Sequence, residues 1–258
     1  MLTYPHIDPI LLHLGPLQIR WYGMMYILGI SLGLAVVWKS LRTTYTMSRD
    51  DIFSLVTSLM IGILLGGRLG YIVFYDAVFY LQHPLEVLSY WHGGMSYHGA
   101  AIGCVIACYL FSKRAKKPFL GLLDLLGLSS TIGLGLGRIG NFINGELYGR
   151  VTTAPWGMIF PSGGPLPRHP SQLYEAAYEG LALFYILVLL YRYARFKPGQ
   201  LFACYLVLYG IGRFCIEFFR EPDVQIGFIL PGVTLGQLLC MTMITVGIGV
   251  FYWSRRTA

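Results

Sequence analysis

Residues 52–74 read IFSLVTSLMIGILLGGRLGYIVF, an apolar run that a single charged side chain, Arg68, interrupts. A helix of about 20 such residues crosses the roughly 30 Å of hydrocarbon in a bilayer. The run therefore predicts a transmembrane helix and a fold built inside the membrane.

The composition supports the same interpretation over the whole chain. Of the 258 residues, 55% are hydrophobic and only 12% are charged, and the mean hydropathy is +0.60. A soluble domain carries about 25% charged residues to cover its surface. These values exclude a soluble enzyme, a disordered chain and a fibre.

Further apolar windows along the chain predict seven transmembrane helices in one domain, residues 1–258. Their approximate bounds are 21–38, 52–74, 93–112, 119–137, 176–191, 201–219 and 233–253. Two windows are rich in glycine, which is common in membrane helices because small residues let helices pack closely. We expect an all-α polytopic membrane protein with an outer loop over 138–175 and a small head or arm region.

Basic residues mark every second connection between these windows. Twelve of the 19 Lys and Arg residues fall in the stretches 39–49, 113–117, 192–197 and 255–256. Basic loops stay in the cytoplasm, so we expect an outer N-terminus and a cytoplasmic C-terminus. The net charge of +7 is then a topology signal, and we expect no nucleic-acid partner.

The basic residues outside those stretches are all arginines, on the outer side or within the membrane. They are Arg20, Arg68, Arg138, Arg150, Arg168, Arg213 and Arg220. Charges at such depth are costly and usually functional, and the planar guanidinium binds phosphate in bidentate fashion. A phospholipid headgroup is the predicted ligand. The alternative for Arg213 is an ion pair with Glu217, four residues on, although we expect too few carboxylates to pair with every arginine.

Three further side chains fall near the outer ends of the windows. We expect His98 to lie about one and a half helical turns into the membrane, where it is the leading candidate for a general base; a structural histidine is the alternative. Tyr22 and Tyr26 are four residues apart, and an interfacial aromatic belt is slightly favoured there over contact with substrate.

Residues 137–150 read GRIGNFINGELYGR, which mixes amides, an acid and two arginines with glycines. Such a stretch predicts irregular backbone that lines a cavity, because polar backbone at membrane depth needs protein or water around it. Five prolines follow between residues 149 and 171 and predict a lid or a substrate-entry arm.

The first thirteen of these residues fill every fixed position of the pattern G-R-x-G-N-F-x-N-x-E-x-x-G, and the sequence resembles the bacterial prolipoprotein diacylglyceryl transferase family. Further resemblance lies in 21–23, 66–71, 93–99, 168–175, 212–214 and 217–223. The outer segment between Arg150 and Arg168 is shorter than in longer members, which leaves the size of the periplasmic head open.

The resemblance implies transfer of the diacylglyceryl group of phosphatidylglycerol to the lipobox cysteine of a preprolipoprotein signal peptide, giving a thioether and glycerol 1-phosphate. It implies a bacterial inner-membrane enzyme with a periplasmic N-terminus and an active site facing the outer leaflet. It also implicates Arg138 in phospholipid binding and treats Arg213 and His98 as important. We expect no cofactor and no metal.

The remaining candidates are substrate-binding residues. Asn141 and Asn144 are expected to hydrogen-bond the headgroup glycerol. Glu146 and Glu217 are expected to orient arginines. The other candidates are Tyr22, Tyr26, Arg68, Tyr71, His169 and Arg220.

Two other classes compete with the transferase. An anion transporter also uses intramembrane arginines, but it predicts a path through both membrane halves, whereas the uncommon polar residues here cluster in the outer half. An intramembrane hydrolase or acyl-enzyme transferase would use Ser129, Ser130 or Cys215. No G-x-S-x-G motif accompanies these residues.

Overall fold

The computed structural model describes residues 2–15, 17–75, 77–89, 94–221, 228–230 and 232–257. Its contacts divide the chain into two compact units, which we describe separately. The first unit comprises residues 1–37 and 124–258, and the second unit comprises residues 38–123. That the chain is one domain stays a prediction.

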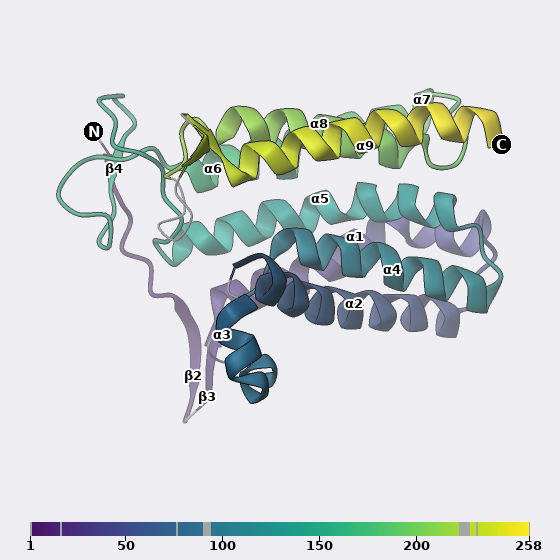
Figure 1. The fold of residues 1–258 in the computed structure, drawn as a ribbon, viewed down its shortest axis with the longest axis horizontal. Helices are drawn as coiled ribbons and strands as arrows, with labels where there is room; N and C mark the ends of the chain where they lie inside the picture. The colour runs from purple at the N-terminus through teal and green to yellow at the C-terminus, as the bar shows by residue number, and fades with distance from the viewer. Residues whose placement is uncertain are drawn as a thin grey trace. The chain divides into compact units, whose positions relative to one another are not determined.

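Helices dominate the described part of the chain (Figure 1). They are α1 (Trp21–Thr43), α2 (Arg49–Tyr75), α3 (Ala77–Gln82), a 3-10 turn (Pro84–Leu88), α4 (Tyr97–Ala115), α5 (Phe119–Ile143), α6 (Ser171–Glu175), a π-helical segment (Ala176–Ala182), α7 (Leu183–Tyr193), α8 (Gln200–Ile216) and α9 (Leu235–Thr257). In these ranges five helical spans are long and apolar enough to cross a membrane: α1, α2, α5, α9 and the continuous span from α6 to α7. With the shorter α8 and with α4, they confirm the predicted all-α polytopic membrane protein.

Short strands, which we did not predict, join parts of the first unit. They are β1 (Leu2–Thr3), β2 (Ile10–Leu14), β3 (Leu17–Arg20), β4 (Met158–Ile159), β5 (Phe228–Leu230) and β6 (Val233–Thr234). β2 and β3 form an antiparallel hairpin, and β1 pairs in parallel with β4. The turn of the hairpin contains Gly15 at a φ of 60°, a conformation that glycine adopts at little cost. The pairing of β1 with β4 ties the N-terminal segment to the loop after α5.

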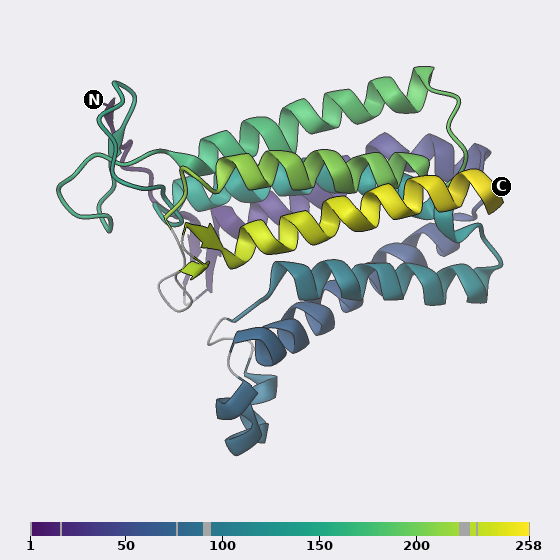
Figure 2. The same ribbon diagram turned by 45° about the horizontal axis from the view of Figure 1, so that its top comes forward.

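Helix α5 is the most buried span of the first unit, with 50% of its apolar window covered. Glycines let two neighbours approach it: a Cβ built on Gly29 would lie 2.8 Å from Gly133 Cα, and one on Gly135 would lie 2.8 Å from Gly180 Cα. Such close backbone approach is typical of helix packing in lipid. Helices α8 and α9 run side by side in both ribbon views (Figures 1 and 2).

The second unit is built on α2 and α4, which lie side by side (Figure 1). Gly62, Gly66 and Gly70 recur every four residues on α2, and they face Gly99 and Gly103 of α4. A Cβ on Gly66 would lie 2.8 Å from Gly103 Cα. The glycine content of the third predicted window therefore serves close helix packing, as expected.

Several predicted bounds were wrong, each for a local reason. The third helix was expected from residue 93, which lies outside the described residues, but α4 begins at Tyr97 because the Ser96 hydroxyl accepts a hydrogen bond from the Gly99 amide (3.2 Å). His98 therefore lies in the first turn of α4, not one and a half turns inside it. Helix α5 continues six residues past the expected end, to Ile143.

The outer loop is correspondingly shorter than predicted, since α6 already begins at Ser171 and not at residue 176. Helix α8 ends at Ile216 instead of residue 219. The stretch 138–143, expected to be irregular, is helical because its polar side chains find partners, as described below. Only after Ile143 does the chain turn, with Gly145 and Leu147 at φ values of 65° and 57°.

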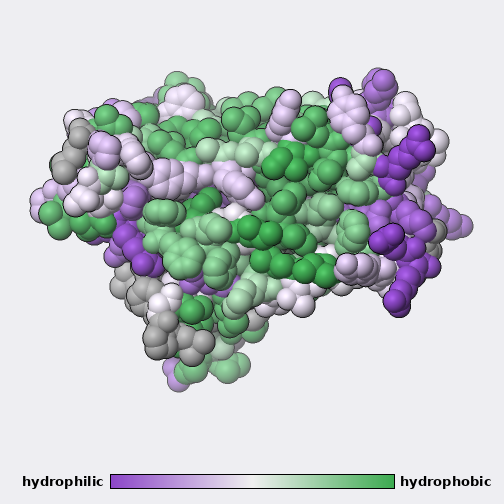
Figure 3. All heavy atoms as spheres, turned by 90° about the horizontal axis from the view of Figure 1, so that it is seen from above, coloured by the Kyte–Doolittle hydropathy of each residue, from purple (hydrophilic) through white to green (hydrophobic). Residues whose placement is uncertain are grey.

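The surface over α7, α8 and α9 is apolar across its middle, and hydrophilic residues gather at the end where α7 and α9 finish (Figure 3). Arg192 lies in the last turn of α7, and Arg255 and Arg256 lie in the last turn of α9. The Lys197 ammonium donates to the Arg255 carbonyl oxygen (3.0 Å). An apolar belt next to a basic end is the pattern of a helix bundle in lipid.

At the start of α8 lies a buried acid, Asp124 of α5, which is 8% exposed. Its carboxylate accepts hydrogen bonds from the backbone amides of Gly199 (2.7 Å) and Phe202 (2.8 Å). These amides belong to the first turn of a helix, whose donors have no partner within the helix. Asp124 therefore caps α8 from a neighbouring helix.

We expect Asp124→Ala to lower the free energy of unfolding by about 2 kcal/mol, because two buried amides lose their acceptor. Denaturation in mixed micelles, followed by circular dichroism, measures this. The matched control is Asp50→Ala, at an exposed position in the first turn of α2, which should cost about 0.5 kcal/mol or less. Equal losses in the two variants would contradict the capping role.

Candidate functional site

A single buried carboxylate, that of Glu175, contacts three arginines in the first unit. Its Oε1 accepts hydrogen bonds from Arg213 Nη1 (2.9 Å) and Arg220 Nη1 (3.2 Å), and its Oε2 lies 3.0 Å from Arg138 Nε. The side chain of Glu175 has no exposed surface. The three arginines come from α5, from the last turn of α8 and from the turn that follows α8.

Two more glutamates complete this group. Glu217 Oε2 lies 2.6 Å from Arg213 Nη2, and its Oε1 accepts a hydrogen bond from the Thr234 hydroxyl (3.0 Å). Glu179, one turn after Glu175, is fully buried and lies at longer range, 3.5 Å from Arg138 Nε and 3.9 Å from Arg213 Nε. We call these six residues the Arg–Glu cluster: Arg138, Arg213, Arg220, Glu175, Glu179 and Glu217.

Within the cluster, the arginine side chains are more exposed than the glutamate side chains. The side chains of Arg138, Arg213 and Arg220 keep 16%, 13% and 11% of their surface exposed, whereas the glutamates keep 7% or less. Buried charges are tolerated when they are paired and hydrogen-bonded. An anion that reaches the cluster therefore meets guanidinium groups before carboxylates, and it meets them in a fixed arrangement.

The local packing that brings the glutamates here depends on small residues. Gly135 of α5 allows the π-helical segment to approach at Gly180, so Glu175 and Glu179 come within reach of Arg138. The ring of Tyr178 lies over Gly212, leaving no room for a Cβ there, and its hydroxyl donates to the Leu208 carbonyl (2.9 Å). Single π-helical turns often occur at functional sites.

The amide side chains of the loop after α5 gather on one carboxylate. Glu146 Oε1 accepts hydrogen bonds from Asn141 Nδ2 (2.9 Å) and Asn144 Nδ2 (3.0 Å). Glu146 was expected to orient an arginine, and its described contacts show that it orients these two asparagines instead. The Gln172 side chain donates to the Glu146 carbonyl oxygen (2.6 Å), so the loop is fixed to the start of α6.

Tyr22 and Tyr26, four residues apart in the sequence, contact each other at the start of α1. The hydroxyls of Tyr22 and Tyr26 are 3.0 Å apart, and their ring centroids are 5.0 Å apart. Tyr22 packs against Gly140 of α5, since a Cβ on that glycine would lie 3.0 Å from the ring. The pair therefore lies against the part of α5 that carries Arg138 and Asn141.

Two arginines of the loop between α5 and α6, Arg150 and Arg168, donate hydrogen bonds to backbone carbonyls. Arg150 Nε donates to the Arg220 carbonyl (2.8 Å). Arg168 donates to the carbonyls of Gly163 (2.8 Å) and Gly149 (3.2 Å), pairs with Glu221 (3.1 Å) and lies over the Tyr148 ring. These contacts give Arg150 and Arg168 a structural role in the loop between α5 and α6.

His169 follows Arg168 and takes part in a chain of hydrogen bonds. The Trp156 indole donates to the Tyr174 hydroxyl (2.7 Å), and that hydroxyl lies 3.1 Å from His169 Nδ1. Since an indole nitrogen can only donate, the tyrosine hydroxyl accepts from Trp156 and keeps its own proton available for His169 Nδ1, which accepts it in the tautomer that carries the ring proton on Nε2. Burial lowers the pKa of His169 below its ordinary value, which favours this neutral ring.

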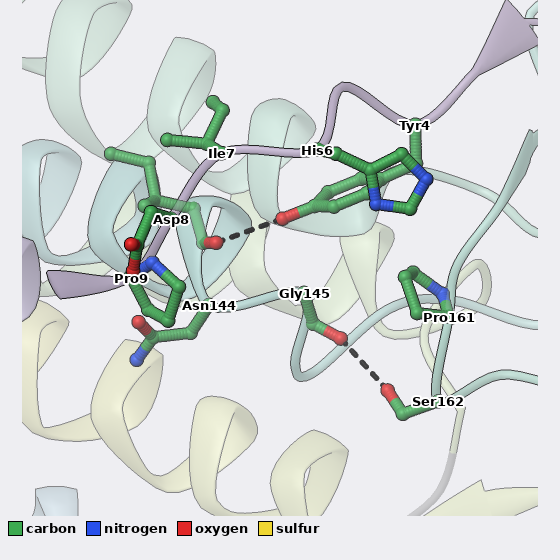
Figure 4. Close-up of a pocket in the computed structure, with 10 residues that line it drawn as sticks. Tyr4, His6, Ile7, Asp8, Pro9, Asn144, Gly145, Pro161 and Ser162 are labelled. Atoms are coloured by element: carbon green, nitrogen blue, oxygen red, sulfur yellow. Dashed lines mark hydrogen bonds between the residues drawn. The ribbon is translucent and has the colours of Figure 1, made fainter.

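The end of α5 also borders a cavity. This cavity of about 370 Å³ lies between the N-terminal segment 4–9, residues 143–145 and the loop at 161–162 (Figure 4). The single proton of the Tyr4 hydroxyl is shared between the carbonyl oxygens of Phe142 (2.6 Å) and Ile143 (2.8 Å) at the end of α5. Carbonyls of the last helical turn need donors of this kind from outside the helix. Burial raises the pKa of Tyr4, so the hydroxyl remains a donor.

In the second unit, the Arg68 guanidinium donates hydrogen bonds to backbone, and its predicted contact with substrate stays a prediction. Arg68 is 2% exposed and donates to the carbonyl oxygens of Glu86 (2.6 Å), Val87 (3.0 Å), Ser89 (3.0 Å) and Gly94 (3.3 Å). These contacts hold residues 86–89 and Gly94 around the guanidinium group.

The other two predicted site residues of the second unit are Tyr71 of α2 and His98 of α4. The Tyr71 ring packs against Gly94 and lies 6.5 Å from the Tyr80 ring. His98 is half-buried, and its ring meets the edge of the Tyr97 ring at 5.3 Å. The role of His98 as a proton acceptor stays a prediction.

Sequence reasoning missed Glu175 and Glu179 as members of the site. The sequence did not show that Arg138, Arg213 and Arg220 pair with carboxylates of another helix, as they do on Glu175. The available signal was the spacing of Glu175 and Glu179, which places two acids on one face of an apolar helix. The alternative raised for Arg213, an ion pair with Glu217, is confirmed.

We expect the pH dependence of stability to report on His169. Burial holds the pKa of this ring in the folded protein below its value near 6.5 in the unfolded chain, so the unfolded chain binds the proton first and stability falls as the pH decreases below that value. Thermal unfolding in detergent at pH 7.5 and 5.5 measures the decrease, which should be smaller in His169→Gln. An unchanged pH dependence in that variant would refute the assignment.

The fold and the site together define a polytopic membrane protein that gathers arginines on buried carboxylates beside the polar loop that follows α5. The family model of prolipoprotein diacylglyceryl transferase matches residues 9–253, and the chain belongs to this family.

Its curated relatives carry the name phosphatidylglycerol–prolipoprotein diacylglyceryl transferase. The protein of Desulfotalea psychrophila is 50% identical over 257 residues, covering 97% of this chain and 94% of the relative. That of Geobacter sulfurreducens is 48% identical over 248 residues, covering 96% and 95%. That of Pseudomonas aeruginosa PAO1 is 46% identical over 258 residues, covering 99% and 97%.

Proposed function

We propose that this chain transfers the diacylglyceryl group of phosphatidylglycerol to the thiol of a lipobox cysteine in a preprolipoprotein. The thiol sulfur forms a bond to the glycerol carbon, and the bond from that carbon to phosphate oxygen breaks. Glycerol 1-phosphate leaves, and the thiol proton passes to a base. Family membership supports the reaction, and the Arg–Glu cluster is the structural observation that carries it.

The cluster suits the charge that develops in this reaction. The phosphate begins as a diester with one negative charge and leaves as a monoester that approaches two. Fixed cations stabilise the second charge only as it forms, which is the condition for lowering the barrier. We assign this task to Arg138 and Arg213, with Arg220 beside them on Glu175.

The neighbouring polar groups then bind the headgroup. The amides of Asn141 and Asn144, oriented by Glu146, are placed to hydrogen-bond the leaving glycerol. The hydroxyls of Tyr22 and Tyr26 lie against the same part of α5. We assign Arg68 to holding the backbone around it, because it donates to four backbone carbonyls and lies over the Tyr80 ring.

His98 is the proposed acceptor of the thiol proton. A free thiol is mostly protonated at neutral pH, and an imidazole has a pKa near the working range. Position in the first turn of α4 and partial exposure support the assignment.

For the orientation, we propose a periplasmic N-terminus and head, a cytoplasmic C-terminus, and a site facing the outer leaflet of the bacterial inner membrane. The basic ends of α7 and α9 support this orientation through the positive-inside rule.

The reaction is tested with the purified chain, labelled phosphatidylglycerol and a lipobox peptide. We expect a thioether-linked lipopeptide and an equal amount of glycerol 1-phosphate, and no product with a Cys→Ser peptide. Absence of transfer in every lipid mixture tried would overturn the proposed function.

Arg138→Lys is expected to lower the transfer rate about 100-fold, in the range seen when one transition-state donor is removed. Lysine keeps the charge but lacks the planar fork with which a guanidinium binds two oxygens of an anion side by side. The matched control is Arg192→Lys, at an exposed position at the end of α7, which should leave the rate unchanged. Near-normal turnover in Arg138→Lys would show that charge alone suffices.

His98→Gln is expected to lower transfer about 100-fold or more while phosphatidylglycerol binding persists, because a general base acts on the chemical step. The control is His83→Gln, an exposed histidine of the same unit. Rates are measured with the lipobox peptide, and binding with a short-chain phosphatidylglycerol. Full activity of purified His98→Gln would remove the base assignment.

A further inference from the structure

Among the described residues, Glu175 is the one carboxylate that contacts three arginines. Its two oxygens lie 2.9, 3.0 and 3.2 Å from nitrogens of Arg213, Arg138 and Arg220. Those arginines are separated by up to 82 positions in the chain and come from different segments. One carboxylate is thus the common point of all three.

The other two glutamates of the cluster do not have this property. Glu217 pairs with Arg213 alone, on the same helical face. Glu179 lies at 3.5 and 3.9 Å from Arg138 and Arg213. Loss of either leaves Glu175 in contact with every guanidinium, whereas loss of Glu175 removes the shared partner from all of them.

We propose that Glu175 is a positioning residue, which holds Arg138, Arg213 and Arg220 in one fixed arrangement for the phosphate group of the lipid. This inference rests on the proposed function. Glu175 is fully buried, so it acts through the arginines and does not itself meet the substrate. Fixed donors that need no rearrangement during the reaction are the source of electrostatic catalysis.

A positioning role has a kinetic signature that a purely structural role lacks. Glu175→Gln keeps the size of the side chain but removes a negative charge beside three cations. The attraction of an anionic lipid is then retained or increased, while the alignment of the guanidinium groups is lost. We therefore expect a lower kcat with an unchanged or lower KM for phosphatidylglycerol.

The experiment measures kcat and KM for phosphatidylglycerol with a lipobox peptide in detergent, and it measures binding of dihexanoyl phosphatidylglycerol by calorimetry. In Glu175→Gln we expect kcat to fall about 10- to 100-fold, as for misplaced catalytic groups, with binding no weaker than in the wild type. The matched control is Glu221→Gln, whose side chain is 46% exposed and pairs with Arg168; its kcat and KM should stay within about twofold.

A second variant keeps the charge, so the test does not depend on the folding of Glu175→Gln. Glu175→Asp withdraws the carboxylate by one methylene and cannot reach all three arginines together. Its kcat should lie between those of the wild type and Glu175→Gln, with KM unchanged. Wild-type kcat in Glu175→Asp, or a loss confined to KM in either variant, would overturn the positioning role.

The two proposals fail in different ways. If the wild-type chain forms no thioether from phosphatidylglycerol, the proposed function is wrong. If the wild type is active and the Glu175 variants keep its kcat, the reaction stands and the positioning role is wrong.

Discussion

The contact between one buried carboxylate and three guanidinium groups is the constraint that organises the first unit. An isolated charge inside an apolar helix bundle is costly, and it becomes tolerable only when partners with opposite charge and good geometry surround it. Glu175 meets Arg138, Arg213 and Arg220 within 3.2 Å. Helix α5, the span that begins with α6, and the end of α8 must therefore meet at this point.

Such a meeting requires helices that approach more closely than large side chains would allow. The contact of Gly135 with Gly180 and the placement of the Tyr178 ring over Gly212 supply that approach. In lipid there is little hydrophobic driving force between helices, so close packing and polar contacts must hold them. The glycines and the charges in this bundle consequently depend on each other.

Local sequence patterns predicted what depends on neighbouring residues. The apolar windows gave the helices, and four-residue spacing gave the Tyr22–Tyr26 and Arg213–Glu217 contacts. Contacts between distant segments were not visible, because pairing of Glu175 with Arg138 and Arg213 depends on which helices pack together. The same reason explains the extension of α5 to Ile143: polar residues end a helix in lipid only when no distant partner satisfies them.

The balance of charge in the Arg–Glu cluster bears on how it would act on a phosphate. Three arginines face three glutamates, so a lipid anion is not held by a large net positive charge. Strong ground-state attraction would in any case lower KM without raising kcat. The cluster instead orients its donors: the buried carboxylates fix the guanidinium groups, which stay partly exposed. Their N–H donors then act most strongly where new charge appears. A rigid Arg–Glu cluster without net charge is therefore better suited to a developing phosphate dianion than a set of mobile, unpaired arginines would be.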